Sequence, residues 1–276
     1  MIEQAVRAGI RLVPIQLGFA AARWLASRPQ RARVSEIEAA ALQSARQERL
    51  GPDGRLPAWV WGDGPTVVLV HGWGGRAAQM APLARRLADS GFRTVAFDVA
   101  GHGDSPVPEA RWEWFIRDVG EVAAACGPLA ALVGHSAGGL AMMASRRIRG
   151  VTAQRFVCIC APHHPYPPIH ALQKRLDPGE KVLQRYRDFL GAQFSTDWKS
   201  LSAGSAWQGA GPELLLCYDE KDRYIESTDG NRIQAMCSGS TLAKSEQFGH
   251  ARILAASETA DTIGDFLKAL STSRTV

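Results

Sequence analysis

One serine lies in a setting that could make it a nucleophile. Ser136 is the centre of Gly-His-Ser-Ala-Gly, residues 134–138, which follows the apolar run 129–133 and precedes a helical pattern. A G-x-S-x-G segment between a strand and a helix predicts a tight turn from which the serine projects, beside a helix N-terminus that favours negative charge. Such a serine could attack an acyl carbon. An ordinary glycine-rich turn is the alternative that this segment alone leaves open.

A serine hydroxyl is a weak nucleophile, so the chemistry needs a base beside it and an acid that orients the base. Of the seven histidines, His250 is the one that follows the last predicted strand and begins a helix, and we assign it as the base. Three acids precede it directly after another apolar run: Asp219, Glu220 and Asp222. Such triads occur in the order serine, acid, histidine. A solvated charged turn is the alternative for these acids.

A second glycine-rich segment could stabilise the negative charge that acyl chemistry creates. His71-Gly72-Trp73-Gly74-Gly75 directly follows the apolar run 67–70, and its glycines leave the backbone open. A tetrahedral oxyanion needs hydrogen-bond donors, and the loss of one slows the reaction by on the order of 100-fold or more. The two segments together therefore favour acyl transfer or hydrolysis more strongly than either one alone.

With a third segment, the chain resembles the α/β-hydrolase family. Residues 97–106, Phe-Asp-Val-Ala-Gly-His-Gly-Asp-Ser-Pro, are similar to the family's D-x-x-G-x-G-x-S loop, in which Asp98 and Ser105 would have architectural roles. The resemblance extends over roughly residues 56–270, and the joint match is far more specific than any single segment.

The resemblance implies roles for the residues around the serine. Ser136 would be the nucleophile, and the backbone amides of Trp73 and Ala137 would form the oxyanion hole. His71 would tie loops together, whereas His135 would pack against the turn or orient it.

The resemblance also implies which acid acts. Residues 219–222 are similar to the family's G-x-x-D segment, with Asp219 in place of the usual glycine, so Asp222 would take the place of the acid and His250 that of the base. Because of this departure, Asp219 and Glu220 stay open as rivals.

The elements that must position these residues alternate along the chain. Apolar, β-rich runs predict strands at 59–61, 66–70, 93–98, 129–134, 155–160, 213–218 and 242–247. Helical intervals predict helices at 76–90, 110–125, 136–149, 223–237 and 251–270. This alternation of strands and helices predicts an α/β fold: a mostly parallel central sheet flanked by helices, with a small helical cap.

The cap is expected where the alternation of predicted strands and helices is interrupted. A core domain of residues 56–161 and 211–276 would be interrupted by an inserted cap at 162–210, since a loop of this length usually has structure of its own. Trp73 from the oxyanion segment and the cap residues Tyr166, Trp198 and Trp207 could line an apolar substrate cleft. Core packing is the alternative for each of them.

Residues 1–55 are expected to form a helical extension. Apolar residues recur at helical spacing with arginines around them: Ile10, Val13, Leu17, Ala21 and Trp24, and Arg7, Arg11, Arg23 and Arg28. The longest uncharged run, residues 12–22, is too short for a bilayer span of about 20 residues, and Glu3 argues against a secretory signal. A helix packed on the domain surface is expected; a membrane-surface contact or a flap over a substrate entrance are the alternatives.

Composition excludes some partners. The formal net charge is +5, but lysines and arginines are scattered along the chain, so we expect no nucleic-acid partner. The five cysteines lie mostly in apolar stretches without metal-ligand spacing, which favours buried free thiols in a reducing cytoplasm. His163, His164 and His170 form no metal-binding pattern, so neither a metal nor a cofactor is expected.

The simplest expectation is a carboxylesterase that accepts small, hydrophobic or polymeric esters through an acyl-enzyme on Ser136. Thioesterase, C–C bond hydrolase and perhydrolase chemistry would use the same residues. A ligand-binding module on the same fold, with slow or absent catalysis, is the alternative from another class. The oligomeric state does not follow from the sequence.

Overall fold

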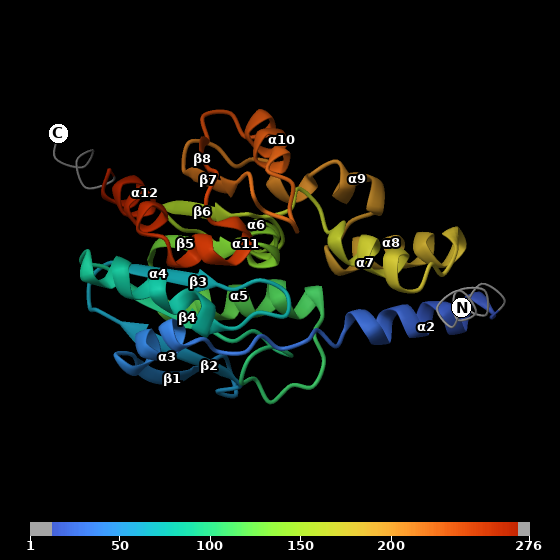
Figure 1. The fold of residues 1–276 in the computed structure, drawn as a ribbon, viewed down its shortest axis with the longest axis horizontal. Coiled ribbons are helices and arrows are strands. Elements are labelled where there is room, and N and C mark those ends of the chain that lie inside the picture. The colour runs from blue at the N-terminus through green and yellow to red at the C-terminus, as the bar shows by residue number, and fades with distance from the viewer. Residues whose placement is uncertain (1–12, 270–276) are drawn as a thin grey trace.

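A computed structural model describes residues 13–269, and within them eight strands form one sheet (Figure 1). The strands are β1 (Arg46–Leu50), β2 (Leu56–Trp61), β3 (Thr66–Val70), β4 (Arg93–Phe97), β5 (Leu129–His135), β6 (Arg155–Ile159), β7 (Leu214–Asp219) and β8 (Thr241–Ser245). Their order in the sheet is β1-β2-β4-β3-β5-β6-β7-β8. The pairs from β4 to β8 are parallel, whereas β1 and β2 join the edge in antiparallel pairs.

The helices of the described residues surround the sheet or lie in the cap. They are α2 (Ile15–Ala26), α3 (Glu36–Gln43), α4 (Ala77–Asp89), α5 (Trp112–Cys126), α6 (Ala137–Arg149), α7 (Pro167–Arg175), α8 (Glu180–Gln193), α9 (Trp198–Ser202), α10 (Thr228–Met236), α11 (Gly249–Arg252) and α12 (Ser257–Lys268). Short 3-10 turns lie at Ser205–Trp207 and Ile253–Ala255.

Both faces of the sheet are buried. In β3, Val68 and Val70 belong to a core shared with α5 and α6, whereas Val67 and Leu69 belong to a second core shared with α4 and α12. Central parallel strands covered on both faces read as continuous apolar runs, which is why they could be located from the sequence. The predicted fold class, a mostly parallel sheet flanked by helices, is confirmed.

One part of the predicted helical extension is wrong. Arg46–Leu50 forms strand β1, which pairs with β2 in register from Arg46 opposite Val60 to Leu50 opposite Leu56. Its sequence, Arg-Gln-Glu-Arg-Leu, is mostly exposed and carries no apolar alternation. A polar edge strand has little local signal, although its charges protect the edge of the sheet from pairing with other chains.

The cap lies between β6 and β7, where the helical insertion is predicted. It contains α7, α8 and α9, and α2 from the N-terminal segment packs against α8 through the rings of Phe19 and Phe189, whose centroids are 5.7 Å apart. Figure 1 shows α2 extending away from the sheet along the cap. Among residues 13–269, no helix is both long and apolar enough to cross a bilayer.

Candidate active site

The turn between β5 and α6 holds Ser136 in a strained conformation. Its φ is 51° and its ψ is −122°, and its amide donates to the Ile159 carbonyl at 2.8 Å. The flanking glycines make this turn possible: a Cβ on Gly138 would lie 2.3 Å from the His71 carbonyl oxygen, and a Cβ on Gly134 would lie 2.5 Å from the Gly139 Cα. Strain of this kind persists only where the surroundings enforce it, and it clusters at active sites.

Two backbone amides are free to bind an anion next to Ser136. Among the hydrogen bonds of residues 13–269, neither the Trp73 nor the Ala137 amide is a donor, and both residues line the same cavity as Ser136. Ala137 begins α6, so the positive end of the helix dipole lies here too. The Trp73 ring stacks on Trp112 with centroids 5.1 Å apart, which holds the loop in place.

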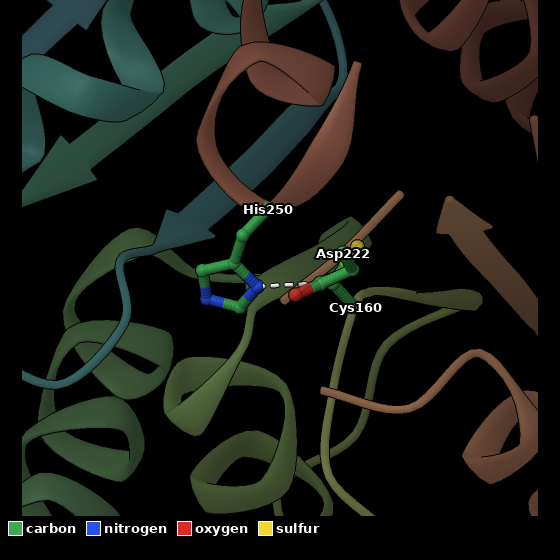
Figure 2. A group of neighbouring side chains, drawn as sticks. All are labelled: Cys160, Asp222 and His250. Atoms are coloured by element: carbon green, nitrogen blue, oxygen red, sulfur yellow. Dashed lines mark hydrogen bonds and ion pairs between the residues drawn. The ribbon is translucent and has the colours of Figure 1, made fainter. Parts of the chain in front are cut away.

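The structure brings Asp222 and His250 together. His250 Nδ1 and Asp222 Oδ2 are 2.6 Å apart (Figure 2), and the Asp222 side chain is 1% exposed. Asp222 Oδ1 accepts hydrogen bonds from the amides of Tyr224 and Ile225 at 2.7 and 3.0 Å. Burial acts to raise the pKa of Asp222, but the His250 contact and the two amides outweigh it, so the pKa lies below its ordinary value.

Ser136 and His250 line one cavity, but no hydrogen bond joins their side chains within residues 13–269. Catalytic hydrogen bonds are often long before substrate binds. The pairing of hydroxyl and imidazole is therefore part of the proposal below and of its test.

The rival acids have other roles. Asp219 is fully buried and accepts hydrogen bonds from five groups of its own loop and the loop before α11: the amides of Lys221, Gln247, Phe248 and Gly249 and the hydroxyl of Ser245. Burial acts to raise its pKa, but these bonds hold the pKa well below its ordinary value. Glu220 instead points to Lys244 and Ser227 at the surface.

Cys160 lies beside the acid and the base. Its Sγ, an Asp222 carboxylate oxygen and a His250 ring nitrogen lie within 4.8 Å of one another (Figure 2), which makes the three residues conceivable metal ligands. Zinc binds nitrogen and oxygen at about 2.0–2.2 Å in tetrahedral geometry. The 2.6 Å separation of His250 Nδ1 and Asp222 Oδ2 is a direct hydrogen bond and leaves no room for an ion between them.

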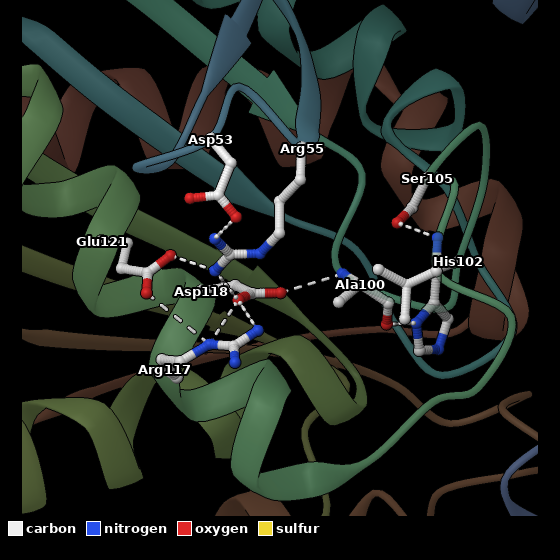
Figure 3. A network of polar contacts seen from close by, with 9 residues as sticks. Asp53, Arg55, Ala100, His102, Ser105, Arg117, Asp118 and Glu121 are labelled. Atoms are coloured by element: carbon white, nitrogen blue, oxygen red, sulfur yellow. Dashed lines mark hydrogen bonds and ion pairs between the residues drawn. The ribbon is translucent and has the colours of Figure 1, made fainter.

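The loop after β4 supports the oxyanion segment. Asp98 accepts hydrogen bonds from the amides of Ala77 and Asp104, which fixes the start of α4 against the loop. Burial raises its pKa to about 6. Figure 3 shows a further anchor on α5: buried Asp118 accepts from the Ala100 amide and pairs with Arg55 and Arg117. These bonds account for an architectural role of residues 97–106.

Two histidines join the loops around the serine. The His71 ring nitrogens contact the Gly72 carbonyl at 2.7 Å and the Val99 amide at 3.2 Å, which ties two loops together. His135 Nε2 donates to the His250 carbonyl at 2.8 Å, since a carbonyl can only accept. Burial lowers the pKa of His135 to about 3, so its ring is neutral near pH 7. Sequence reasoning missed this link, because nothing local connects residues 115 positions apart.

The cavity above Ser136 has a volume of about 660 Å³ and an apolar wall to which several separate parts of the chain contribute. Trp73 lines it as predicted, but Tyr166, Trp198 and Trp207 do not. Trp207 is fully buried and donates to the His163 carbonyl, and Trp198 packs on the His164 ring. The Tyr166 hydroxyl lies against the Glu226 amide. The prediction that these three rings line the cavity is wrong, because Trp207 is turned into the core and the rings of Tyr166 and Trp198 pack against His164.

Other residues supply the wall that these aromatic residues were expected to form. They are Leu25 and Ala26 of α2, Trp112 of α5, Leu172 of α7, Tyr186 of α8, and Tyr224 and Ile225 after β7. The helical spacing of residues 13–24 gave a signal for the α2 contribution, since a flap over a substrate entrance is one reading of it. The others have no signal of their own in the sequence.

Comparisons with known proteins identify the family and the fold. A family model described as "Alpha/beta hydrolase family" matches residues 67–262. A pimeloyl-[acyl-carrier protein] methyl ester esterase of Stenotrophomonas maltophilia (strain K279a) is 43% identical over 82 residues, 29% of this chain and 30% of the relative. A second such esterase, from strain R551-3, is 39% identical over 83 residues and is likewise matched over 30% of its length. The chain thus matches under a third of the length of these relatives.

Solved structures share the fold at low identity. A crystal structure of a membrane phospholipase A has a TM-score of 0.61 and 18% identity, with 97% of this chain and 96% of that chain covered. The esterase RhEst1 from Rhodococcus sp. ECU1013 has a TM-score of 0.59 and 20% identity, with 82% and 99% covered. Since the family model covers well over half of the sequence, the chain belongs to the alpha/beta hydrolase family.

Proposed function

We propose that the protein is a serine hydrolase that cleaves carboxylic esters through an acyl-enzyme on Ser136. One observation supports this most strongly: a buried carboxylate, Asp222, holds the ring of His250 in the cavity that the strained Ser136 enters. The serine, the base, the acid and two free amides are the parts that acyl transfer requires.

In the first step, His250 Nε2 accepts the Ser136 proton as Oγ bonds to the carbonyl carbon of the ester. The carbonyl oxygen becomes an oxyanion and is stabilised by the amides of Trp73 and Ala137. The C–O bond to the alcohol then breaks, and the alcohol leaves with the proton from His250. Asp222 stays ionised throughout, because its pKa is low, and it stabilises the imidazolium that forms.

In the second step, water attacks the acyl-enzyme. His250 takes a proton from the water, a second oxyanion forms at the same amides, and the bond to Ser136 Oγ breaks. The acid leaves, and His250 returns its proton to the serine. Each step conserves the proton that passes between Ser136, His250 and the leaving group.

The cavity sets the substrate class. A volume of about 660 Å³ with Leu25, Trp112 and Leu172 in its wall suits an ester with a hydrophobic acyl or aryl part. The two curated relatives are named methyl ester esterases, so methyl esters belong in the substrate panel. Polymeric esters would have to present a single chain to this cavity.

The test is turnover of p-nitrophenyl and methyl esters across a series of acyl lengths. For Ser136→Ala, kcat should fall by on the order of 10⁶-fold, toward background. Ser202→Ala is the matched control, because Ser202 lies on α9 outside the cavity and bonds only to the Lys199 carbonyl. Equal activity of Ser136→Ala and wild type would refute the mechanism.

Labelling with a fluorophosphonate separates the remaining outcomes. Labelling of Ser136 without ester turnover would point to thioester, C–C bond or peroxide chemistry at the same serine. If Ser136 neither reacts with the fluorophosphonate nor turns over any ester, thioester or amide, the cavity is that of a ligand-binding protein and the proposal fails.

A further inference from the structure

Four of the large apolar side chains that residues 13–269 expose belong to the N-terminal segment. They are Val13, Ile15, Leu17 and Trp24. Leu17 and Trp24 are each 60% exposed and are seven residues apart on α2, which places them on the same face of the helix. Leu17 and Trp24 are the stripe; Val13 precedes the helix, and its methyl group lies 3.8 Å from a Cβ built on Gly18, on the packed side of α2. Scattered exposed apolar residues are normal, but a contiguous set marks a contact surface.

The opposite face of α2 already has its partner. Gly18 and Ala22 are buried, and a Cβ on Gly18 would lie 3.0 Å from a Val182 methyl group on α8. Phe19 packs edge-on against Phe189. Packing on the cap therefore accounts for one side of α2, and it leaves the exposure of Leu17 and Trp24 unexplained.

The positive charge of the protein comes from the same segment. Residues 1–35 contain six of the 32 lysines and arginines and one of the 27 acids, which leaves 26 of each sign in residues 36–276. No acid occurs between Gln4 and Ser35. Arg23 lies over the Phe189 ring of α8, whereas Arg28 lies 4.8 Å from the centroid of the Trp24 ring and pairs with Glu109 at 3.4 Å. Arg28 also lines the active-site cavity. Arg7 and Arg11 lie outside the described residues.

We propose that α2 docks the protein on an anionic lipid surface. The stripe of Leu17 and Trp24 enters the boundary between headgroups and acyl chains, and the excess positive charge of residues 1–35 attracts the anionic headgroups. An uncovered apolar stripe on a basic helix with a tryptophan fits a lipid surface, for which each basic side chain near the surface adds to the attraction.

Docking through α2 also places the active site at the lipid surface. The end of α2 supplies Leu25 and Ala26 to the wall of the cavity that contains Ser136. An amphiphilic ester could pass from the lipid along the helix into the cavity without crossing bulk water. This consequence rests on the proposed ester hydrolysis, whereas docking itself does not.

Co-sedimentation with vesicles tests the docking. The vesicles are three parts phosphatidylcholine to one part phosphatidylglycerol, with pure phosphatidylcholine as the neutral comparison. Wild type and Ser136→Ala should bind the anionic vesicles equally. Leu17→Gln/Trp24→Gln should bind them at least about tenfold more weakly, since both large apolar contacts are lost. Ile37→Gln/Ile148→Gln is the matched control: both residues are exposed and apolar, but they lie on α3 and α6.

The salt dependence of vesicle binding separates the electrostatic contribution from the apolar one. Raising NaCl from about 0.1 M to about 1 M shortens the Debye length from about 10 Å to about 3 Å, so binding of wild type to the anionic vesicles should weaken toward that to neutral ones. Unchanged binding at high salt, or equal binding to the two vesicle types, would show that anionic headgroups are not recognised.

Three results would overturn the proposal: no binding of wild type to anionic vesicles, equal binding by the stripe variant, or a wild-type dimer in sedimentation velocity that the stripe variant cannot form. The last result would assign the stripe to a second copy of the chain. Failure of the proposed hydrolysis would look different, because it would abolish turnover of a water-soluble ester and leave vesicle binding intact.

Discussion

At the scale of single residues, Asp219 and Asp222, three positions apart at the end of β7, have different roles. Asp222 presents one oxygen to His250 and the other to two amides, so its role is to orient and stabilise the base. Among the described residues, Asp219 makes no hydrogen bond to His250 but joins its own loop to the loop that carries His250. The sequence alone could not decide which aspartate is the acid, because the two differ in the hydrogen-bond donors that surround them in the fold.

Exchange of each aspartate for asparagine should separate these roles. Asp222→Asn should lower kcat by about 10⁴-fold, because an amide facing the ring favours the wrong tautomer of His250. Asp219→Asn should instead destabilise the fold by about 2–4 kcal/mol, since one acceptor oxygen cannot serve five donors. Urea unfolding and ester turnover measure the two effects. A greater loss of activity in folded Asp219→Asn would reverse the assignment.

The stability effect of Asp219 should also depend on pH. Its pKa in the folded protein lies below the value of about 3.9 in the unfolded chain. The carboxylate therefore stabilises the fold fully above about pH 5, and this contribution decreases as the pH falls through and below the unfolded value. The difference in unfolding free energy between wild type and Asp219→Asn should shrink between pH 6 and pH 3. A constant difference over this range would show that the charge of Asp219 is not what stabilises the loop.

At the scale of helices and strands, glycines show where packing is tight and where it is loose. Gly191 in α8 lies against the start of α9: an added Cβ would come within 2.9 Å of backbone atoms of Thr196, Asp197 and Trp198. Gly264 in α12 has open space, with nothing within 4 Å of an added Cβ. Both are helical, so the intrinsic gain from replacing glycine with alanine is the same.

The two substitutions should therefore act in opposite directions. Gly264→Ala should stabilise the protein by about 0.5–1 kcal/mol through the lower entropy of the unfolded chain. Gly191→Ala should destabilise it by about 1–3 kcal/mol, because backbone atoms cannot move away as a flexible side chain could. Thermal unfolding of both variants beside wild type measures this. A stabilised Gly191→Ala would mean that α8 and α9 are less tightly packed than described.

The helices and strands differed in how well they could be predicted from the sequence. The central strands and the segments around Ser136 and Trp73 could be located because their signals are local: apolar runs, glycines and chain order. β1 was missed because a polar edge strand has no apolar pattern. The substrate-facing side of the cap was misjudged because the facing of Trp198 and Trp207 depends on how whole helices pack.

At the scale of the whole molecule, the N-terminal segment joins the cap to the catalytic core. α2 packs on α8, and the chain after it reaches the loops around the site: the Ala110 amide donates to the Ser27 carbonyl, and the Ala32 amide donates to the Gly74 carbonyl beside the oxyanion segment. The family model matches residues 67–262, so this connection begins in a segment that the model does not match.

Arg31 is the side chain that fastens this segment to the core. Its guanidinium donates to the carbonyls of Gly103, Ser105 and Val107, in the loop that supports the oxyanion segment.

Because Arg31 is largely exposed, Arg31→Ala should lower the free energy of unfolding by only about 1 kcal/mol. Hydrogen exchange should nevertheless accelerate at residues 25–33 and 72–75. KM for long acyl esters should also rise more than KM for short ones, because six of residues 25–32 line the cavity. Arg33→Ala is the control, since Arg33 makes no hydrogen bond or ion pair within residues 13–269 and should leave exchange and acyl-length preference unchanged. Equal exchange in both variants would show that the segment is held by its backbone bonds and by α8 alone.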